Sequence, residues 1–150
     1  MKFVAGLVVV AIASVAWCAD TKKDASINGL WMLTSGVKGG EAMPADALKK
    51  VHLQLRNGTY NAKVGDATDI GTYTVDESKS PKTLTLTGTS GPNKGKTMLA
   101  IFELEGTTLK VCYDLSGKAF PEAFESKKAD SFLATYARSK FQKRPVKASE

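Results

Sequence analysis

Apolar and polar residues alternate along most of the chain from residue 30 onward. Segments 51–56, 83–87 and 108–113 carry apolar residues at every second position, as antiparallel strands with one buried and one wet face do. Gly, Asn, Asp and Pro interrupt these segments at short intervals, and helical periodicity is nearly absent. The pattern predicts strands near residues 30–34, 51–56, 59–64, 70–75, 83–87, 97–104, 108–113 and 131–138.

A few segments depart from this alternation. Residues 98–102 (MLAIF) are apolar on both faces, which predicts a central strand or one covered by another segment. Asn57-Gly58 is the pair that a tight type I′ hairpin requires, because both central residues need a positive φ. Residues 45–50, after Pro44, and residues 121–126 predict short helical turns.

About eight short strands can form a closed barrel or a sandwich. Short connections between consecutive strands favour the barrel, which also removes the sheet edges. The expected fold class is therefore all-β, an antiparallel up-and-down β-barrel of about eight strands with one or two short helical turns. The residues expected to point into it, and to contact a ligand there, are Leu33, Val51, Leu53, Leu55, Tyr60, Leu84, Leu86, Phe102, Val111 and Tyr113.

The N-terminal segment has the pattern of a secretory signal peptide. Lys2 precedes an apolar run at 3–16, which is shorter than the roughly 20 residues of a spanning helix. Cleavage after Ala16 or after Cys18 fits equally, and lipid anchoring through Cys18 stays open but is disfavoured by the bulky Trp17. We therefore expect an exported protein, periplasmic or extracellular, with no transmembrane segment after signal cleavage.

The 150 residues are enough for one folded domain, and the expected divisions follow from composition. They are a signal peptide at 1–18, a polar linker at 19–28, a barrel domain at 29–138 and a basic disordered tail at 139–150. The tail holds four lysine or arginine residues and one acid, and so accounts for much of the net charge of +6. The charge is therefore a poor argument for nucleic-acid binding, and none is expected.

Only two cysteines occur in the chain. If Cys18 is cleaved off or lipidated, Cys112 remains alone and an intramolecular disulfide is excluded. Because Cys112 lies in an apolar run, we expect it to be a small buried hydrophobe.

Two distant residues resemble a feature of lipocalin-like barrels. Gly29-Leu30-Trp31 matches the G-x-W at the start of the first strand, and Arg138 follows the last predicted strand. The resemblance implies that Trp31 closes the barrel floor and that Arg138 stacks over it, a reasonable cation–π contact.

Longer strings narrow the resemblance. Residues 71–73 (GTY), 80–82 (SPK), 91–98 (GPNKGKTM) and 109–113 (LKVCY) look like the "Planctomycetes uncharacterized domain" family, over about residues 29–138. Residues 128–130 depart from it, since Lys-Ala-Asp replaces a glycine-rich turn. The resemblance implies a short lipocalin-like domain of exported proteins, and it supplies no activity or site.

The string at 91–97 (GPNKGKT) is similar to a phosphate-binding loop but is one residue short and precedes a strand instead of a helix. It predicts a connecting loop, with a weak anion contact at Lys94 and Lys96 left open.

The inventory of chemically active residues is small. One histidine and one core cysteine are too few ligands for a zinc site, so no metal and no cofactor are predicted. Because His52 lies on the polar phase of its strand, it is expected to be a solvated or edge histidine. Asp66 and Asp69 are expected to be turn residues instead of calcium ligands. Acidic pairs occur at Asp76-Glu77, at Glu103 and Glu105, and at Glu122 and Glu125. Glu103 and Glu105 are expected to line a wet face instead of an acid/base site, and no catalytic group is nominated.

Two hypotheses about function follow. The first is an exported barrel that binds a small apolar or amphipathic molecule, or a short peptide, at its open end. The alternative is a packed structural or interaction module of the cell envelope without a small-molecule ligand. The oligomeric state stays open.

Overall fold

The computed structural model describes residues 26–140. This part of the chain contains one short helix, α1 (Ala45–Leu48), and nine strands: β1 (Gly29–Lys38), β2 (Glu41–Ala42), β3 (Val51–Arg56), β4 (Thr59–Val64), β5 (Ala67–Asp76), β6 (Lys82–Ser90), β7 (Thr97–Glu105), β8 (Thr108–Asp114) and β9 (Ser131–Arg138). The expected signal peptide at 1–18, most of the expected linker and the tail from residue 141 lie outside the described residues.

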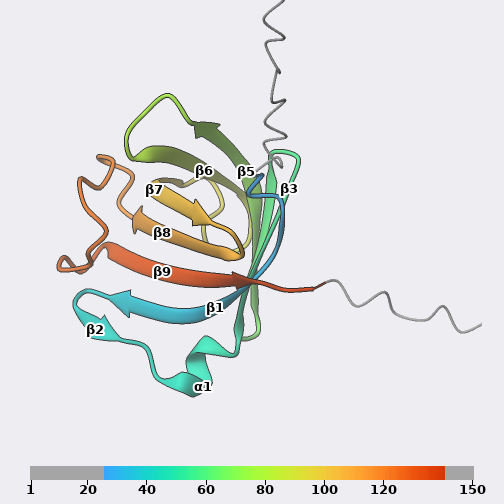
Figure 1. Cartoon of the computed structure of the whole chain (residues 1–150). Helices are drawn as coiled ribbons and strands as arrows, with labels where there is room; N and C mark the ends of the chain where they lie inside the picture. Colours follow the sequence, from blue (N-terminus) through green and yellow to red (C-terminus); the bar gives the residue numbers. More distant parts are fainter. Residues whose placement is uncertain (1–25, 141–150) are drawn as a thin grey trace, which may run out of the picture.

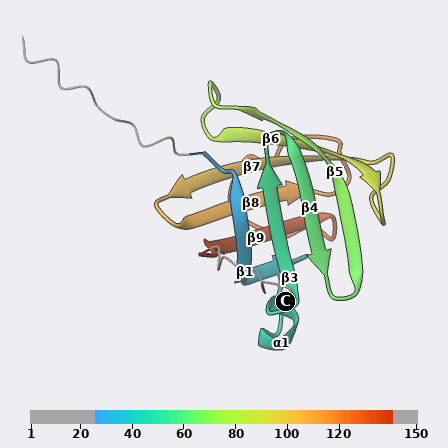
Figure 2. The same cartoon turned by 90° about the vertical axis from the view of Figure 1, so that its right-hand side faces the viewer.

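The strands form a closed antiparallel barrel. They pair in the order β2-β1-β3-β4-β5-β6-β7-β8-β9, and β1 also pairs with β9. Because β2 is a two-residue ribbon on the end of β1, eight strands make the barrel wall (Figure 1). Figure 2 shows β3, β4 and β5 forming one wall in front of β7, β8 and β9. The predicted all-β barrel is therefore confirmed.

The two ends of the barrel differ. At the end that we call the closed end, β1 begins, β9 finishes and tight hairpins join β3 to β4 and β7 to β8. The first of these hairpins has φ 47° at Asn57 and 84° at Gly58, which confirms the predicted type I′ geometry. At the opposite end, which we call the mouth, longer connections at 39–50, 91–96 and 115–130 leave and re-enter the wall.

Trp31 and Arg138 close the first of these ends. The Trp31 side chain is fully buried, and its Nε1–H donates to the Ile27 carbonyl at 2.8 Å. The Arg138 guanidinium lies 4.3 Å from the Trp31 ring centre and donates to the carbonyls of Asn28 and Ser26 at 2.6 and 2.9 Å. Since Ile27 is also buried, the folded domain extends two residues ahead of the expected start at Gly29.

The interior is built from the alternation seen in the sequence. All ten residues predicted to point inward are buried in one apolar core. The same core also contains Ile27, Trp31, Tyr73, Met98, Ala100, Leu109, Ala134 and Tyr136. Glu103 and Glu105 lie on the wet face of β7, as expected.

The segment between β8 and β9 differs from the prediction. Residues 121–126 are not helical, so the second predicted helical turn is wrong, whereas the first is confirmed by α1. Instead the segment lies against the outer face of β8, where the Cys112 thiol donates to the Glu125 carbonyl at 3.3 Å and the Lys110 ammonium lies 5.5 Å from the Phe124 ring. This covering layer explains why Ile101, the neighbour of Cys112 across β7 and β8, is buried on the outer face.

Some limits of the elements also differ. β5 begins at Ala67 and β1 continues to Lys38, both beyond the predicted strands, and β2 is too short to leave a periodic signal. Within residues 26–140, no helix is long and apolar enough to cross a membrane.

Candidate ligand-binding cavity

A cavity of about 340 Å³ opens at the mouth of the barrel. Its volume lies within the usual range for small-molecule sites. Most of its wall is apolar, and the residues that line it are Val51, His52, Leu53, Tyr60, Ala62, Val64, Ala67, Asp69, Leu86, Pro92, Asn93, Met98, Tyr113, Leu115, Phe132 and Tyr136.

The ten predicted inward residues divide into two groups. Five of them line the cavity, namely Val51, Leu53, Tyr60, Leu86 and Tyr113. The other five are buried in the core without lining it, namely Leu33, Leu55, Leu84, Phe102 and Val111. The cavity thus lies at the mouth, with buried core side chains below it.

Asp69 is the polar centre of the cavity. Its side chain is buried, with 7% of the residue exposed, and points inward from β5. The carboxylate accepts hydrogen bonds from the Tyr60 hydroxyl at 3.2 Å, the Asn93 backbone N–H at 3.2 Å and the Asn93 side-chain amide at 2.7 Å. The expectation that Asp69 is a turn residue is wrong, because β5 begins two residues earlier and brings position 69 into the inward phase of the strand.

The loop at 91–96 folds against the barrel beside Asp69. Gly88 donates its N–H to Lys96 and accepts from Gly95, so the loop backbone lies directly on β6. A Cβ at Gly88 would lie 1.9 Å from the Asn93 carbonyl oxygen, so only glycine permits this approach. The predicted connecting loop is confirmed, and it contributes Pro92 and Asn93 to the cavity wall.

Two buried tyrosines form a second polar group in the cavity wall. The hydroxyls of Tyr113 and Tyr136 lie 3.2 Å apart, and one of them donates to the other. Burial raises the pKa of Tyr136 from 10.0 to about 12 and also raises the pKa of Tyr113. Both hydroxyls are therefore neutral at physiological pH, and one hydrogen of the pair remains available to an acceptor on a guest.

Sequence reasoning missed several lining residues. Phe132 and Tyr136 occupy alternate positions along β9, so the two-residue repeat of a strand could have predicted that both point inward. Asn93 and Leu115 carry no such signal, because each lies in a connection. Asn93 is held by Asp69 of β5, and the Leu115 N–H donates to the Asp130 carbonyl just before β9.

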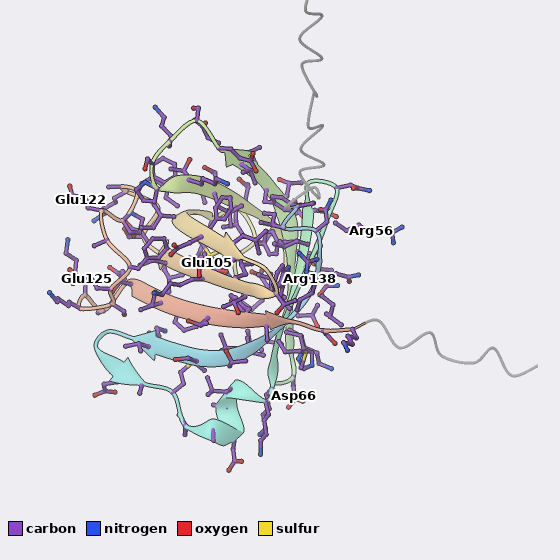
Figure 3. The ribbon with its side chains drawn as sticks, viewed as in Figure 1. Arg56, Asp66, Glu105, Glu122, Glu125 and Arg138 are labelled. Atoms are coloured by element: carbon purple, nitrogen blue, oxygen red, sulfur yellow. The ribbon has the colours of Figure 1, made fainter. Side chains whose placement is uncertain are left out.

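Other candidate chemistry is not assembled in the described part of the chain. Residues 26–140 contain no group of three or more His, Cys, Asp or Glu side chains placed to hold a metal ion. Figure 3 shows Glu122 and Glu125 on the segment between β8 and β9, apart from Glu105 of β7. His52 is half-buried on the outward phase of β3, and its Nδ1 atom is buried without a hydrogen-bond partner, so it is less solvated than expected.

A scan of the sequence against protein-family models, a search of curated proteins and a search of solved structures found no match.

Proposed function

We propose that this protein binds one small amphipathic molecule in the mouth of its barrel. The observation that supports this best is the cavity of about 340 Å³, in which an apolar wall surrounds a few polar groups. Apolar surface that stays open to water is costly, and a guest that covers it gains free energy in proportion to the area removed from water.

The cavity also limits the size of the guest. The cavity volume of about 340 Å³ lies at the lower end of the range for small-molecule sites. A short alkyl chain or a single aromatic ring with a polar substituent is of this size, whereas a folded partner or a long peptide is not.

The proposal assigns the protein a binding role and no catalysis or cofactor. It includes export, for which the apolar run at residues 3–16 is the support. Membership of the "Planctomycetes uncharacterized domain" family stays a prediction from the strings quoted above.

Native mass spectrometry of the protein purified from the cells or medium that naturally produce it tests the proposal. We expect an additional mass that is lost when the same sample is denatured. A bare mass from gently handled protein would favour the packed envelope module. The intact mass also reports whether residues 1–16 or 1–18 have been removed.

A further inference from the structure

We propose that Asp69 selects a positively charged head group, so that the guest of the cavity is an organic ammonium with an apolar body. This inference rests on the proposed binding function and adds the charge of the ligand to it.

The charged groups of the cavity wall favour a cationic guest. Among the lining residues, Asp69 is the single carboxylate, and no lysine or arginine is present. The two salt bridges of residues 26–140 are Lys49–Asp46 and Lys127–Glu125, both on the surface and neither involving Asp69. A buried carboxylate is costly without a cationic partner, and here hydrogen bonds supply its only compensation.

The hydrogen bonds around the Asp69 carboxylate favour the same kind of guest. Tyr60 and Asn93 donate three hydrogen bonds to it, whereas two carboxylate oxygens can accept about four. An ammonium donor on a guest would complete the set, and a charge-assisted hydrogen bond of this kind is about twice as strong as a neutral one.

The remaining wall of the cavity includes several aromatic rings. The rings of Tyr60, Tyr113, Phe132 and Tyr136 line the same cavity. Aromatic faces attract cations through their quadrupole, and the attraction grows where water is excluded. A carboxylate guest such as a fatty acid would meet neither of these partners and would be repelled by Asp69.

Three probes of equal length separate charge from apolar contact. Isothermal titration calorimetry at about pH 8 compares octylamine, which is an ammonium at this pH, with neutral octanol and anionic octanoate. Repeating the titrations at high salt screens the exposed lysines of the surface and leaves a buried pair largely intact. We expect octylamine to bind at least about tenfold more tightly than octanol, and octanoate at least about tenfold more weakly.

Asp69→Asn then tests the residue itself. It removes the charge and keeps an oxygen acceptor for Asn93, so octylamine and octanol should bind within about twofold of each other. The matched control is Asn93→Ala, which removes the amide donor at 2.7 Å but keeps the carboxylate, and should retain the preference for octylamine.

The outcomes are distinguishable. Equal binding of octylamine and octanol to the natural protein overturns the charge assignment and leaves the binding function standing. An Asp69→Asn variant that loses affinity for both probes equally shows that Asp69 only positions the loop, and also overturns it. Absence of binding by all three probes overturns the proposed function and this inference together. The comparison of probes on the natural protein decides even if the variant does not fold.

Discussion

Arg138 on the last strand of the barrel lies over Trp31 on the first, with 4.3 Å between the guanidinium and the centre of the indole ring. The same guanidinium donates hydrogen bonds to two carbonyls of the segment that leads into β1. One side chain thus joins both ends of the described fold at the point where the barrel closes.

Arg138→Ala should lower the free energy of unfolding by about 1–3 kcal/mol, because it removes a cation–π contact and two charge-assisted hydrogen bonds. Arg138→Lys keeps the charge but not the planar fork, so its loss should be intermediate. Urea denaturation followed by tryptophan fluorescence measures both.

The control for this pair is Lys140→Ala, which removes an exposed basic residue two positions later and should change stability by less than about 0.5 kcal/mol. A loss at Arg138 no larger than that at Lys140 would show that the stacking is not a stabilising contact.

Gly88→Ala should disturb the mouth, because the new methyl group would overlap the Asn93 carbonyl in the loop at 91–96. Overpacking of this kind costs about 1–3 kcal/mol, and the displaced loop should also weaken octanol binding. Thermal denaturation and calorimetry measure the two effects. Thr87→Ala, at an exposed position beside it on β6, should change neither, and equal effects at both positions would contradict the loop geometry.

The barrel was predictable and its cavity only partly so. Val51, Leu53 and Leu55 point inward because alternate side chains of a strand lie on the same face. This alternation can be seen in the sequence of the strand alone. Asp69 was missed because its inward position depends on β5 extending past its apolar residues to pair with β4. Asn93 was missed because the path of its loop depends on Gly88 and Asp69, which are close only after folding.

The buried tyrosines predict a loss of stability at high pH. Burial raises the pKa of Tyr136 to about 12, so the folded state keeps a proton that the unfolded chain releases near pH 10. The contribution of these tyrosines to the free energy of unfolding should therefore be fully present below about pH 10. Between about pH 10 and pH 12 the free energy of unfolding should fall by about 1.4 kcal/mol per pH unit for each such tyrosine. Tyr136→Phe should make this decline shallower.

Absorbance at 295 nm with parallel circular dichroism checks this expectation. Ionisation of the buried tyrosines should coincide with unfolding. Complete tyrosine ionisation near pH 10 in a chain that is still folded would contradict their burial.

Cys112 should be protected from thiol reagents in the folded state. Its side chain is fully buried under the segment between β8 and β9, and burial raises the pKa of its thiol. In a Cys18→Ser background, labelling of the native protein should be at least about a hundredfold slower than that of the unfolded chain. Phe124→Ala should accelerate it by loosening the cover, and similar rates for the native and unfolded chains would show that the segment does not cover β8.

Nuclear magnetic resonance tests the central claim most directly, since it reports where a probe binds. Amide signals of the ¹⁵N-labelled protein are followed while octylamine or octanol, whichever binds more tightly, is added to saturation. The account predicts shifts at the mouth, at Ala67, Asn93 and Leu115, with the Trp31 indole signal at the closed end unchanged. Shifts confined to the closed end or to the outer face near Arg56 and Ile70, or no shifts at all, would contradict it.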